Sequence, residues 1–360
     1  MRLVPIEYVK PGDILGKTIY DINGIALLKY GVILENNTIN KLKDLKIYSL
    51  YIIDEYSTEE IEDVIKPELR QKAIMIVKEA VYNMKKITVA DKYSGKDEKY
   101  FNNISSIVEN IMDDVLNNKD LVLSLVDIRS MDNYIFAHSV NVAVISLILG
   151  SKLKLPKSKL GYLCMGALIH DIGKTFISTE ILNKEKLSYE ESKLIEQHPI
   201  VGYKYISDTY NLSSFVKLIV LEHHERPNGL GTPNGLKDEE INELSKIVSI
   251  ADAYDNLSTD RPNKRAMFPS DVLEYLMSNS GKLFDHHMVE VFCRIVVPFS
   301  IGTIVKLSNN DIAIVKETVK NYPLRPIVEV IESDNKELIG QKINLIENLS
   351  ITITEIKYEI

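Results

Sequence analysis

Residues 160–175 read LGYLCMGALIHDIGKT, an apolar run that ends in a histidine and an aspartate. Its periodicity predicts a helix over 157–172 that places His170 and Asp171 at its end. Adjacent side chains there can both reach one metal ion, or one of them can bridge two ions. Gly173 permits a tight turn just after them, and Lys174 offers a cation to a phosphate beside the metal. Taken alone, the His-Asp pair is better explained as a capped helix end.

The other histidines favour the metal interpretation. All seven lie between positions 138 and 287, and five of them, with Asp252, recur at intervals of roughly 25 to 32 residues. That interval is about one helix-plus-loop unit of an all-α bundle. Imidazoles mixed with carboxylates, without cysteine, describe a site for Fe, Mn or Zn. The candidate metal ligands are His138, His170, Asp171, His198, His223, His224 and Asp252.

Each of these histidines also has a simpler explanation. His138 interrupts an apolar helix and could be a core histidine, and His198 could face solvent at a helix end. His223-His224 could be a solvated pair, but two adjacent imidazoles are costly to bury without partners, which favours coordination. The similar pair His286-His287 stands at the start of a short helix and is interpreted as structural or surface.

The chain is expected to be mainly α, with an all-helical bundle flanked by two small β-containing modules. The predicted domains are an N-terminal regulatory module (1–120), a helical domain (121–297) and a C-terminal β module (298–360). A hairpin is expected over 14–30, and a polar loop over 91–99. A capping box at Ser188 should open the helix that carries His198. Helices are predicted over 61–84, 104–116, 133–153, 157–172, 188–198, 212–222, 239–257, 270–277 and 288–294.

The composition indicates an ordinary globular chain. Hydrophobic residues make up 45% and charged residues 26%, with a net charge of -8 and a pI of about 5.5. A broad electrostatic footprint for a nucleic acid polymer is therefore not expected. The two cysteines imply no disulfide framework, the first residues lack the features of a signal peptide, and the apolar stretch at 142–149 is too short to span a bilayer. These features together predict a cytoplasmic protein without a membrane span.

Two further segments can contact a ligand. Residues 227–235, PNGLGTPNG, contain three glycines and two prolines and should form a shaped loop beyond His224 that approaches a ligand or acts as a lid. Asp255 lies three positions after Asp252 on one helix face and should orient a histidine or a basic residue. Arg261, Lys264 and Arg265 form the best local basic cluster and suit a phosphate clamp, although a solvated charge run is the alternative.

These residues together resemble the HD-GYP family, a branch of the HD superfamily of metal-dependent phosphohydrolases. The matching run covers about residues 121–296: His138, HDIGK at 170–174, His198, HHE at 223–225, G-x-G-x-P at 229–233, D-x-x-D at 252–255 and RP-x-K at 261–264. Residues 9–15 and the hairpin after them resemble an N-terminal module often found before this domain.

The resemblance implies an all-helical catalytic core and hydrolysis of cyclic di-GMP to pGpG or GMP in bacterial second-messenger signalling. It implies that His138, His170, Asp171 and Asp252 hold one metal, and that Asp171 bridges to a second metal held by His198, His223 and His224. It also implies that Lys174, Arg261 and Lys264 bind phosphate.

Three positions depart from the family pattern. The name-giving Gly-Tyr-Pro is Gly231-Thr232-Pro233, so an aromatic contact near the ligand is missing. The acidic residue usual before the first of those glycines is Asn228, and the position of a Glu that helps to hold a third metal is Tyr134. We therefore expect two divalent ions, with Fe or Mn favoured. The departures bear on substrate choice, to which Gly231 and Thr232 should contribute.

The expected mechanism is metal-assisted phosphodiester hydrolysis, in which metal-activated hydroxide attacks phosphorus. Asp171 and Lys174 are the expected catalytic residues, the lysine by stabilising the transition state. Two rival functions are a catalytically silent cyclic-dinucleotide receptor and an HD phosphohydrolase for another cyclic dinucleotide or nucleotide. A homodimer or a signalling protein is a possible partner.

Overall fold

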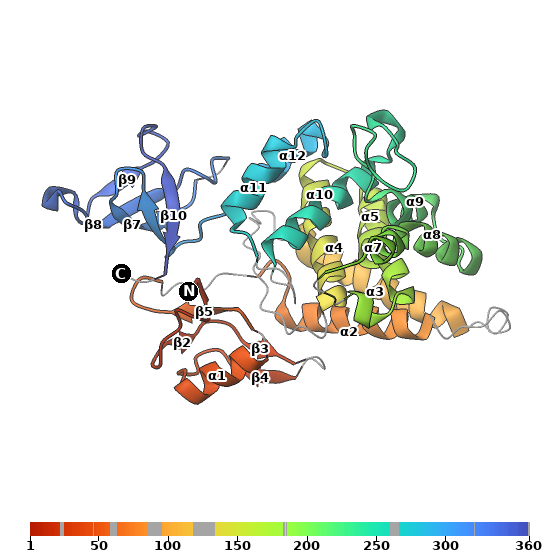
Figure 1. Ribbon diagram of the computed structural model, residues 1–360, viewed down its shortest axis with the longest axis horizontal. Helices are drawn as coiled ribbons and strands as arrows, with labels where there is room; N and C mark the ends of the chain where they lie inside the picture. The colour runs from red at the N-terminus through yellow and green to blue at the C-terminus, as the bar shows by residue number, and fades with distance from the viewer. Residues whose placement is uncertain are drawn as a thin grey trace.

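The structure is a computed structural model of the chain. It describes residues 1–21, 25–45, 47–57, 63–84, 96–117, 134–182, 184, 186–259, 266–319 and 321–358, with the backbone alone at 84, 96–101 and 134. An N-terminal β module, a helical body and a C-terminal β module follow one another along the chain (Figure 1). The predicted fold class is therefore confirmed.

The N-terminal module contains two small sheets and one helix. β5 lies between β1 and β2, and pairs antiparallel with both. β3 pairs antiparallel with β4, which confirms the inner part of the hairpin predicted over 14–30, while its turn at 22–24 lies outside the described residues. The start of the predicted first strand, Ile14–Leu15, is instead the separate strand β2, which pairs with β5. The elements are β1 (Arg2–Pro5), β2 (Ile14–Leu15), β3 (Ile19–Tyr20), β4 (Ala26–Leu28), α1 (Asn36–Asp44) and β5 (Ser49–Ile53).

The helical body is built around one apolar core, and the catalytic candidates lie on its helices. Most predicted helices are found within a few residues of their expected ends, because most of them bury apolar residues at helical spacing. The elements are α2 (Pro67–Met84), α3 (Lys96–Asn117), α4 (Tyr134–Lys152), α5 (Lys157–Ile169), η3 (Ile172–Phe176), α6 (Thr179–Leu182), α7 (Tyr189–Glu196), α8 (His198–Thr209), α9 (Ser214–Glu222), η4 (Asp238–Glu240), α10 (Glu243–Ser258), α11 (Pro269–Ser278) and α12 (His286–Cys293).

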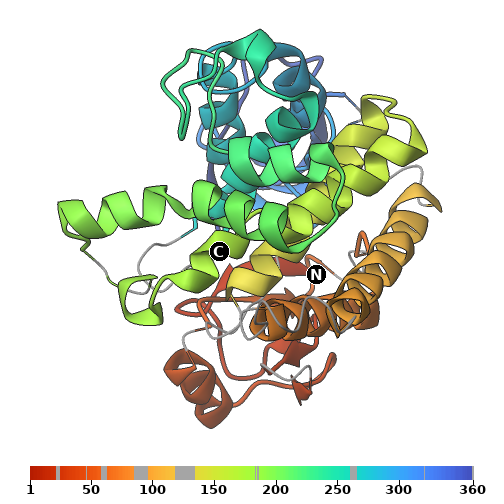
Figure 2. The same ribbon diagram turned by 90° about the vertical axis from the view of Figure 1, so that its right-hand side faces the viewer.

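Helices α2 and α3 pack with the helical body. A single cluster of buried apolar side chains runs from Val64 to Val296 and includes Val77 of α2 and Ile107 of α3. Figures 1 and 2 show both helices between the N-terminal β module and the remaining helices. The packing favours a boundary near residue 60 over the expected one at 120, and we propose the division of the chain on that basis. Of the loop predicted at 91–99, the first part lies outside the described residues and Lys96 already begins α3.

The helix opened by Ser188 ends before His198. Ser188 and Glu191 form the predicted capping box, in which each side chain accepts a hydrogen bond from the backbone N–H of the other residue. Helix α7 then stops at Glu196, and His198 begins α8 with Pro199 in its first turn. Proline has no N–H to donate, so it is tolerated at a helix start but not in a helix interior. The prediction that the Ser188 helix carries His198 was therefore wrong.

Helix α4 is the most apolar helix of the core. By length and composition alone, its segment Ile135–Lys152 is long and apolar enough to cross a membrane, with a mean hydropathy of 1.5, so the apolar helix extends well beyond the stretch 142–149 considered in the sequence. Within the structure 83% of that segment is buried. Core helices of folded domains often pass this test, and α4 packs against α2, α3, α5, α10 and α12.

The C-terminal module is an antiparallel sheet of five strands in the order β10-β6-β7-β8-β9. No pairing joins β10 to β9 among the described residues, so the sheet is open. It confirms that the segment after residue 298 is built from strands. The elements are β6 (Ile304–Leu307), β7 (Ile312–Glu317), β8 (Ile327–Glu332), η5 (Lys336–Leu338), β9 (Lys342–Asn344) and β10 (Ile353–Lys357).

Tyr358, which follows β10, brings the two β modules together. Its ring stacks on Tyr8 of the N-terminal module, with 5.3 Å between ring centroids, and on Phe268 before α11, at 6.3 Å. The guanidinium of Arg2 also donates to the Tyr358 carbonyl oxygen. The end of the chain therefore contacts both the N-terminal module and the helical body.

Candidate metal centre

Five helices deliver the candidate metal ligands to one place inside the helical body. His138 lies on α4, His170 and Asp171 follow α5, His198 begins α8, the pair His223-His224 follows α9, and Asp252 lies on α10. All are buried except His224, whose side chain is 26% exposed. The structure therefore brings together all seven residues that the sequence singled out as metal ligands.

A glycine sets the contact between the end of α5 and the start of α8. A Cβ atom on Gly173 would lie 1.9 Å from the carbonyl oxygen of His198 and 2.9 Å from the backbone nitrogen of Gly202. No other residue fits such a contact without displacing the backbone. The close approach brings Asp171 next to His198, so Gly173 helps to build the site and does more than allow the predicted turn.

The carboxylate of Asp171 lies between two groups of histidines. Its Oδ1 is 3.1 Å from Nε2 of His198 and 3.8 Å from Nε2 of His223. Its Oδ2 is 3.5 Å from Nε2 of His170 and 3.8 Å from Nε2 of His138. Asp171 belongs to both groups of side chains that could hold a metal ion, one completed by His138 and His170 and the other by the three remaining histidines.

Asp252 faces the same space from α10. Its Oδ1 lies 3.0 Å from Nε2 of His138 and 3.7 Å from Nε2 of His170. Its Oδ2 lies 4.0 Å from Nδ1 of His224. Asp252 therefore sits on the side of the His138–His170 pair, as expected for a ligand of that group.

Hydrogen bonds at the outer nitrogen orient four of the imidazoles. Nδ1 of His170 lies 2.7 Å from the Ala167 carbonyl oxygen, and Nδ1 of His198 lies 2.7 Å from that of Ile195. Nδ1 of His223 contacts carbonyl oxygens of α9, and Nδ1 of His138 lies 2.7 Å from Asp255. When Nδ1 carries the proton, the lone pair of Nε2 points to the centre of the site. The interpretation of Asp255 as a residue that orients a histidine agrees with this contact.

The electrostatics of the site favour metal ligation. Burial holds the pKa of His223 well below its usual value and lowers the pKa of His224 to about 3. Burial opposes ionisation of Asp171, but Lys174 and His170 keep its pKa well below the usual range. His138 and His170 do the same for the pKa of Asp252, again against burial. Near neutral pH, ionised carboxylates and unprotonated His223 and His224 are therefore ready to bind a cation.

Two buried atoms at the centre lack a hydrogen-bond partner among the described residues. They are Nε2 of His170 and Oδ1 of Asp171. A buried polar atom without a partner is costly, and a metal ion would satisfy both at once. The residues present therefore fit a divalent ion.

Lys174 forms an ion pair with the carboxylate of Asp171. Its Nζ lies 2.6 Å from Oδ2 of Asp171, and its side chain is 21% exposed. The predicted phosphate-binding lysine is thus beside the site and reachable from solvent. Arg261 and Lys264 lie outside the described residues.

The loop beyond His224 is held by Glu225, a member of the HHE motif to which the sequence assigned no role. The buried carboxylate of Glu225 accepts hydrogen bonds from the backbone N–H groups of Asn234, at 2.6 Å, and Leu236, at 2.9 Å. Thr232 N–H donates to the His224 carbonyl oxygen, and a Cβ on Gly231 would lie 2.3 Å from the Arg226 nitrogen. An acidic residue directly after two ligands was the signal for this role. The predicted shaped loop is therefore confirmed.

His286 and His287 lie on the surface, as expected. Nδ1 of His286 lies 2.8 Å from the Ser280 hydroxyl, and the side chain of His287 is 73% exposed.

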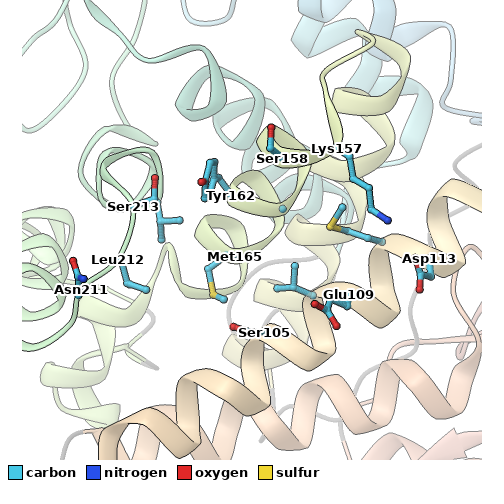
Figure 3. A pocket seen from close by; sticks show the side chains of 14 residues that line it. Ser105, Glu109, Asp113, Lys157, Ser158, Tyr162, Met165, Asn211, Leu212 and Ser213 are labelled. Atoms are coloured by element: carbon cyan, nitrogen blue, oxygen red, sulfur yellow. The ribbon is translucent and has the colours of Figure 1, made fainter.

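A cavity of about 660 Å³ lies elsewhere on the helical body, lined by side chains of α3, α5 and the start of α9, among them Glu109, Lys157 and Tyr162 (Figure 3). No candidate metal ligand lines that cavity.

Residues 122–288 match the family model described as HD domain. This segment is an HD domain. The HD domain implies that this part of the chain binds divalent metal, in agreement with the cluster around Asp171. The resemblance to the HD-GYP family, inferred from the order of the motifs, is confirmed by this match together with the relatives of the chain.

Three curated relatives are similar to part of the chain. Cyclic di-GMP phosphodiesterase PA4108 of Pseudomonas aeruginosa is 32% identical over 63% of this chain and 55% of its own length. Cyclic di-GMP phosphodiesterase PdeB of Borreliella burgdorferi is 32% identical over 62% of this chain and 59% of its own length. The 3'3'-cGAMP-specific phosphodiesterase 3 of Vibrio cholerae is 34% identical over 45% of this chain and 35% of its own length. The chain thus spans less than two thirds of each relative.

Proposed function

We propose that the HD domain of this chain is a metal-dependent phosphodiesterase that hydrolyses cyclic di-GMP to pGpG, GMP or both in bacterial second-messenger signalling. The observation that carries the proposal is the position of Asp171, with Oδ1 3.1 Å from His198 and Oδ2 3.5 Å from His170. A carboxylate shared by two groups of imidazoles is suited to a two-metal site for phosphoryl chemistry. The names of two relatives support the substrate class.

The donor set would hold two ions that share Asp171. Nitrogen and carboxylate oxygen donors without sulfur favour Fe or Mn, while Zn fits the same donors. One ion would be held by His138, His170, Asp171 and Asp252, and the other by Asp171, His198, His223 and His224.

Such ions supply positive charge against the phosphoryl oxygens and acidify a water molecule. The chain's own residues bind and orient the substrate. Lys174, whose Nζ lies 2.6 Å from Oδ2 of Asp171, would bind a substrate phosphate beside the ions. Arg261 and Lys264 complete the phosphate clamp, and Gly231 and Thr232 of the Glu225-anchored loop contact the substrate.

The test is elemental analysis of anaerobically purified full-length chain, followed by a hydrolysis assay on the same sample. We expect two equivalents of Fe or Mn and conversion of cyclic di-GMP to a linear product. Tight binding of cyclic di-GMP without product would overturn the enzymatic proposal and favour a receptor.

A second candidate substrate is 3'3'-cGAMP. The similarity to a 3'3'-cGAMP-specific phosphodiesterase favours it, and Thr232 stands where the family pattern has an aromatic residue. Rates measured side by side for both dinucleotides decide between them, and a faster rate for 3'3'-cGAMP would replace cyclic di-GMP in the proposal.

The cellular setting is proposed from the sequence. The two thiols, Cys164 and Cys293, are both free in the structure, in line with a reducing cytoplasm. A homodimer or a signalling partner would act through the flanking β modules, and size-exclusion chromatography with light scattering tests for the dimer.

A further inference from the structure

A guanidinium is buried on α2, outside the segment that matches the HD domain. Arg70 is 4% exposed, although arginine is rarely buried without partners. A buried charge needs hydrogen bonds and opposite charge to offset the loss of water. The partners of Arg70 therefore indicate the role of this buried charge.

Hydrogen bonds link Arg70 to the metal centre. Nη1 of Arg70 donates to Oδ1 of Asn141 on α4, and Nδ2 of Asn141 donates to Oδ1 of Asp255 on α10, at 2.9 Å. Oδ2 of Asp255 lies 2.7 Å from Nδ1 of His138. Asn141, Asp255 and His138 are all at most 3% exposed. The whole chain of contacts is therefore shielded from solvent.

The chemistry of the groups fixes the direction of each hydrogen bond from Arg70 to His138. A guanidinium only donates and a carboxylate only accepts, so the Asn141 amide between them has one possible orientation. Asp255 then accepts the Nδ1 proton of His138, and Nε2 of His138 is left as the ligand atom. Arg70 also places a positive charge at the opposite side of the Asn141 amide from the Asp255 carboxyl group.

We propose that Arg70 is a positioning residue of the metal centre, which acts through Asn141 and Asp255 to hold His138 in its ligating orientation. Part of the metal affinity thereby resides in α2, outside the HD domain. The inference rests on the proposed function, because it requires that His138 ligates an ion. It concerns the ion beside His138 and leaves the ion beside His223-His224 unaffected.

The test is a Mn²⁺ titration of the metal-free full-length chain, with free Mn²⁺ followed by its EPR signal. In Arg70→Met we expect one of two ions to bind roughly 10- to 100-fold more weakly, the usual cost of losing an outer hydrogen bond to a metal ligand. The other ion should bind within about twofold of the parent chain. Arg70→Lys keeps the charge and one donor, and should recover part of the loss.

Lys72→Met is the matched control, since it removes an exposed cation two residues away on the same helix and should bind both ions as the parent does. Asn141→Leu breaks the same chain of contacts without removing a buried charge, and remains informative if Arg70→Met does not fold. The double variant should bind no more weakly than the weaker single variant, because both act through Asp255.

Equal weakening of both ions, or unchanged affinity in Arg70→Met and Asn141→Leu, would overturn the inference. Fully additive losses in the double variant would do the same. If the parent chain binds no ion, the proposed function itself fails, and that result is visible before any variant is made.

Discussion

Nζ of Lys174 lies 2.6 Å from Oδ2 of Asp171, so the cation expected to bind phosphate is held by the carboxylate expected to join two ions. The ammonium of Lys174 and a metal ion would compete for Oδ2 of Asp171. Metal binding and substrate binding are therefore coupled through this ion pair, and a variant of each residue should separate them.

Lys174→Met should bind Mn²⁺ at least as tightly as the parent chain, because a competing positive charge is gone. Hydrolysis of cyclic di-GMP should fall by roughly tenfold or more, as expected when a group that stabilises phosphoryl charge is lost. Metal titration and steady-state kinetics on one preparation measure both. Lys184→Met, which removes a surface lysine paired with Glu191, serves as the control. Weaker Mn²⁺ binding in Lys174→Met would contradict this account.

Asp171→Ala should lose both ions and all hydrolysis together, because both histidine groups share this carboxylate. Elemental analysis and a turnover assay report the two losses. Asp113→Ala, at an exposed position on α3, should keep both properties. If Asp171→Ala still hydrolyses the substrate at the parent rate, the proposed mechanism is wrong.

Gly173→Ala should destabilise the chain by about 3 kcal/mol, since the new Cβ overlaps a backbone oxygen. Gly161→Ala in α5 meets only the Met112 sulfur at 3.8 Å, and should instead stabilise by about 0.5–1 kcal/mol. Urea unfolding of both variants measures the difference. Similar midpoints for the two variants would show that η3 can move away from α8 without cost.

The metal-free chain should lose stability as the pH falls from 6.5 towards 3. The pKa of His224 is lowered from 6.5 to about 3 and that of His223 lies well below 6.5, so the unfolded chain binds more protons in this window. The raised pKa of His138 has the opposite effect on stability, but it is a single group against both His223 and His224. The urea midpoint at about pH 7.5 and about pH 5 tests this. His224→Gln should flatten the dependence, and an unchanged slope in that variant would refute the assignment.

The candidate ligands could be proposed from the sequence because their selection rests on local information. Helical periodicity placed His138 and Asp252 on helices, and residue chemistry selected the donors. The helix break before His198 was missed, although Pro199 signalled it. The hydrogen bonds from Arg70 to Asn141 and from Asn141 to Asp255 could not be predicted from the sequence. The residues of each pair are 71 and 114 positions apart, respectively. Periodicity within one helix carries no information about which distant helix lies opposite.

The single apolar core that includes both Val64 and Val296 sets where this chain can be cut for engineering. A fragment trimmed to residues 122–288 would leave out α2 and α3, expose the faces of α4 and α5 that they cover, and discard Arg70. Sensor fusions and crystallisation fragments should instead begin before Val64. Chimeras joined there keep the complete core, and any new input domain would then be attached next to α2, the helix that carries Arg70.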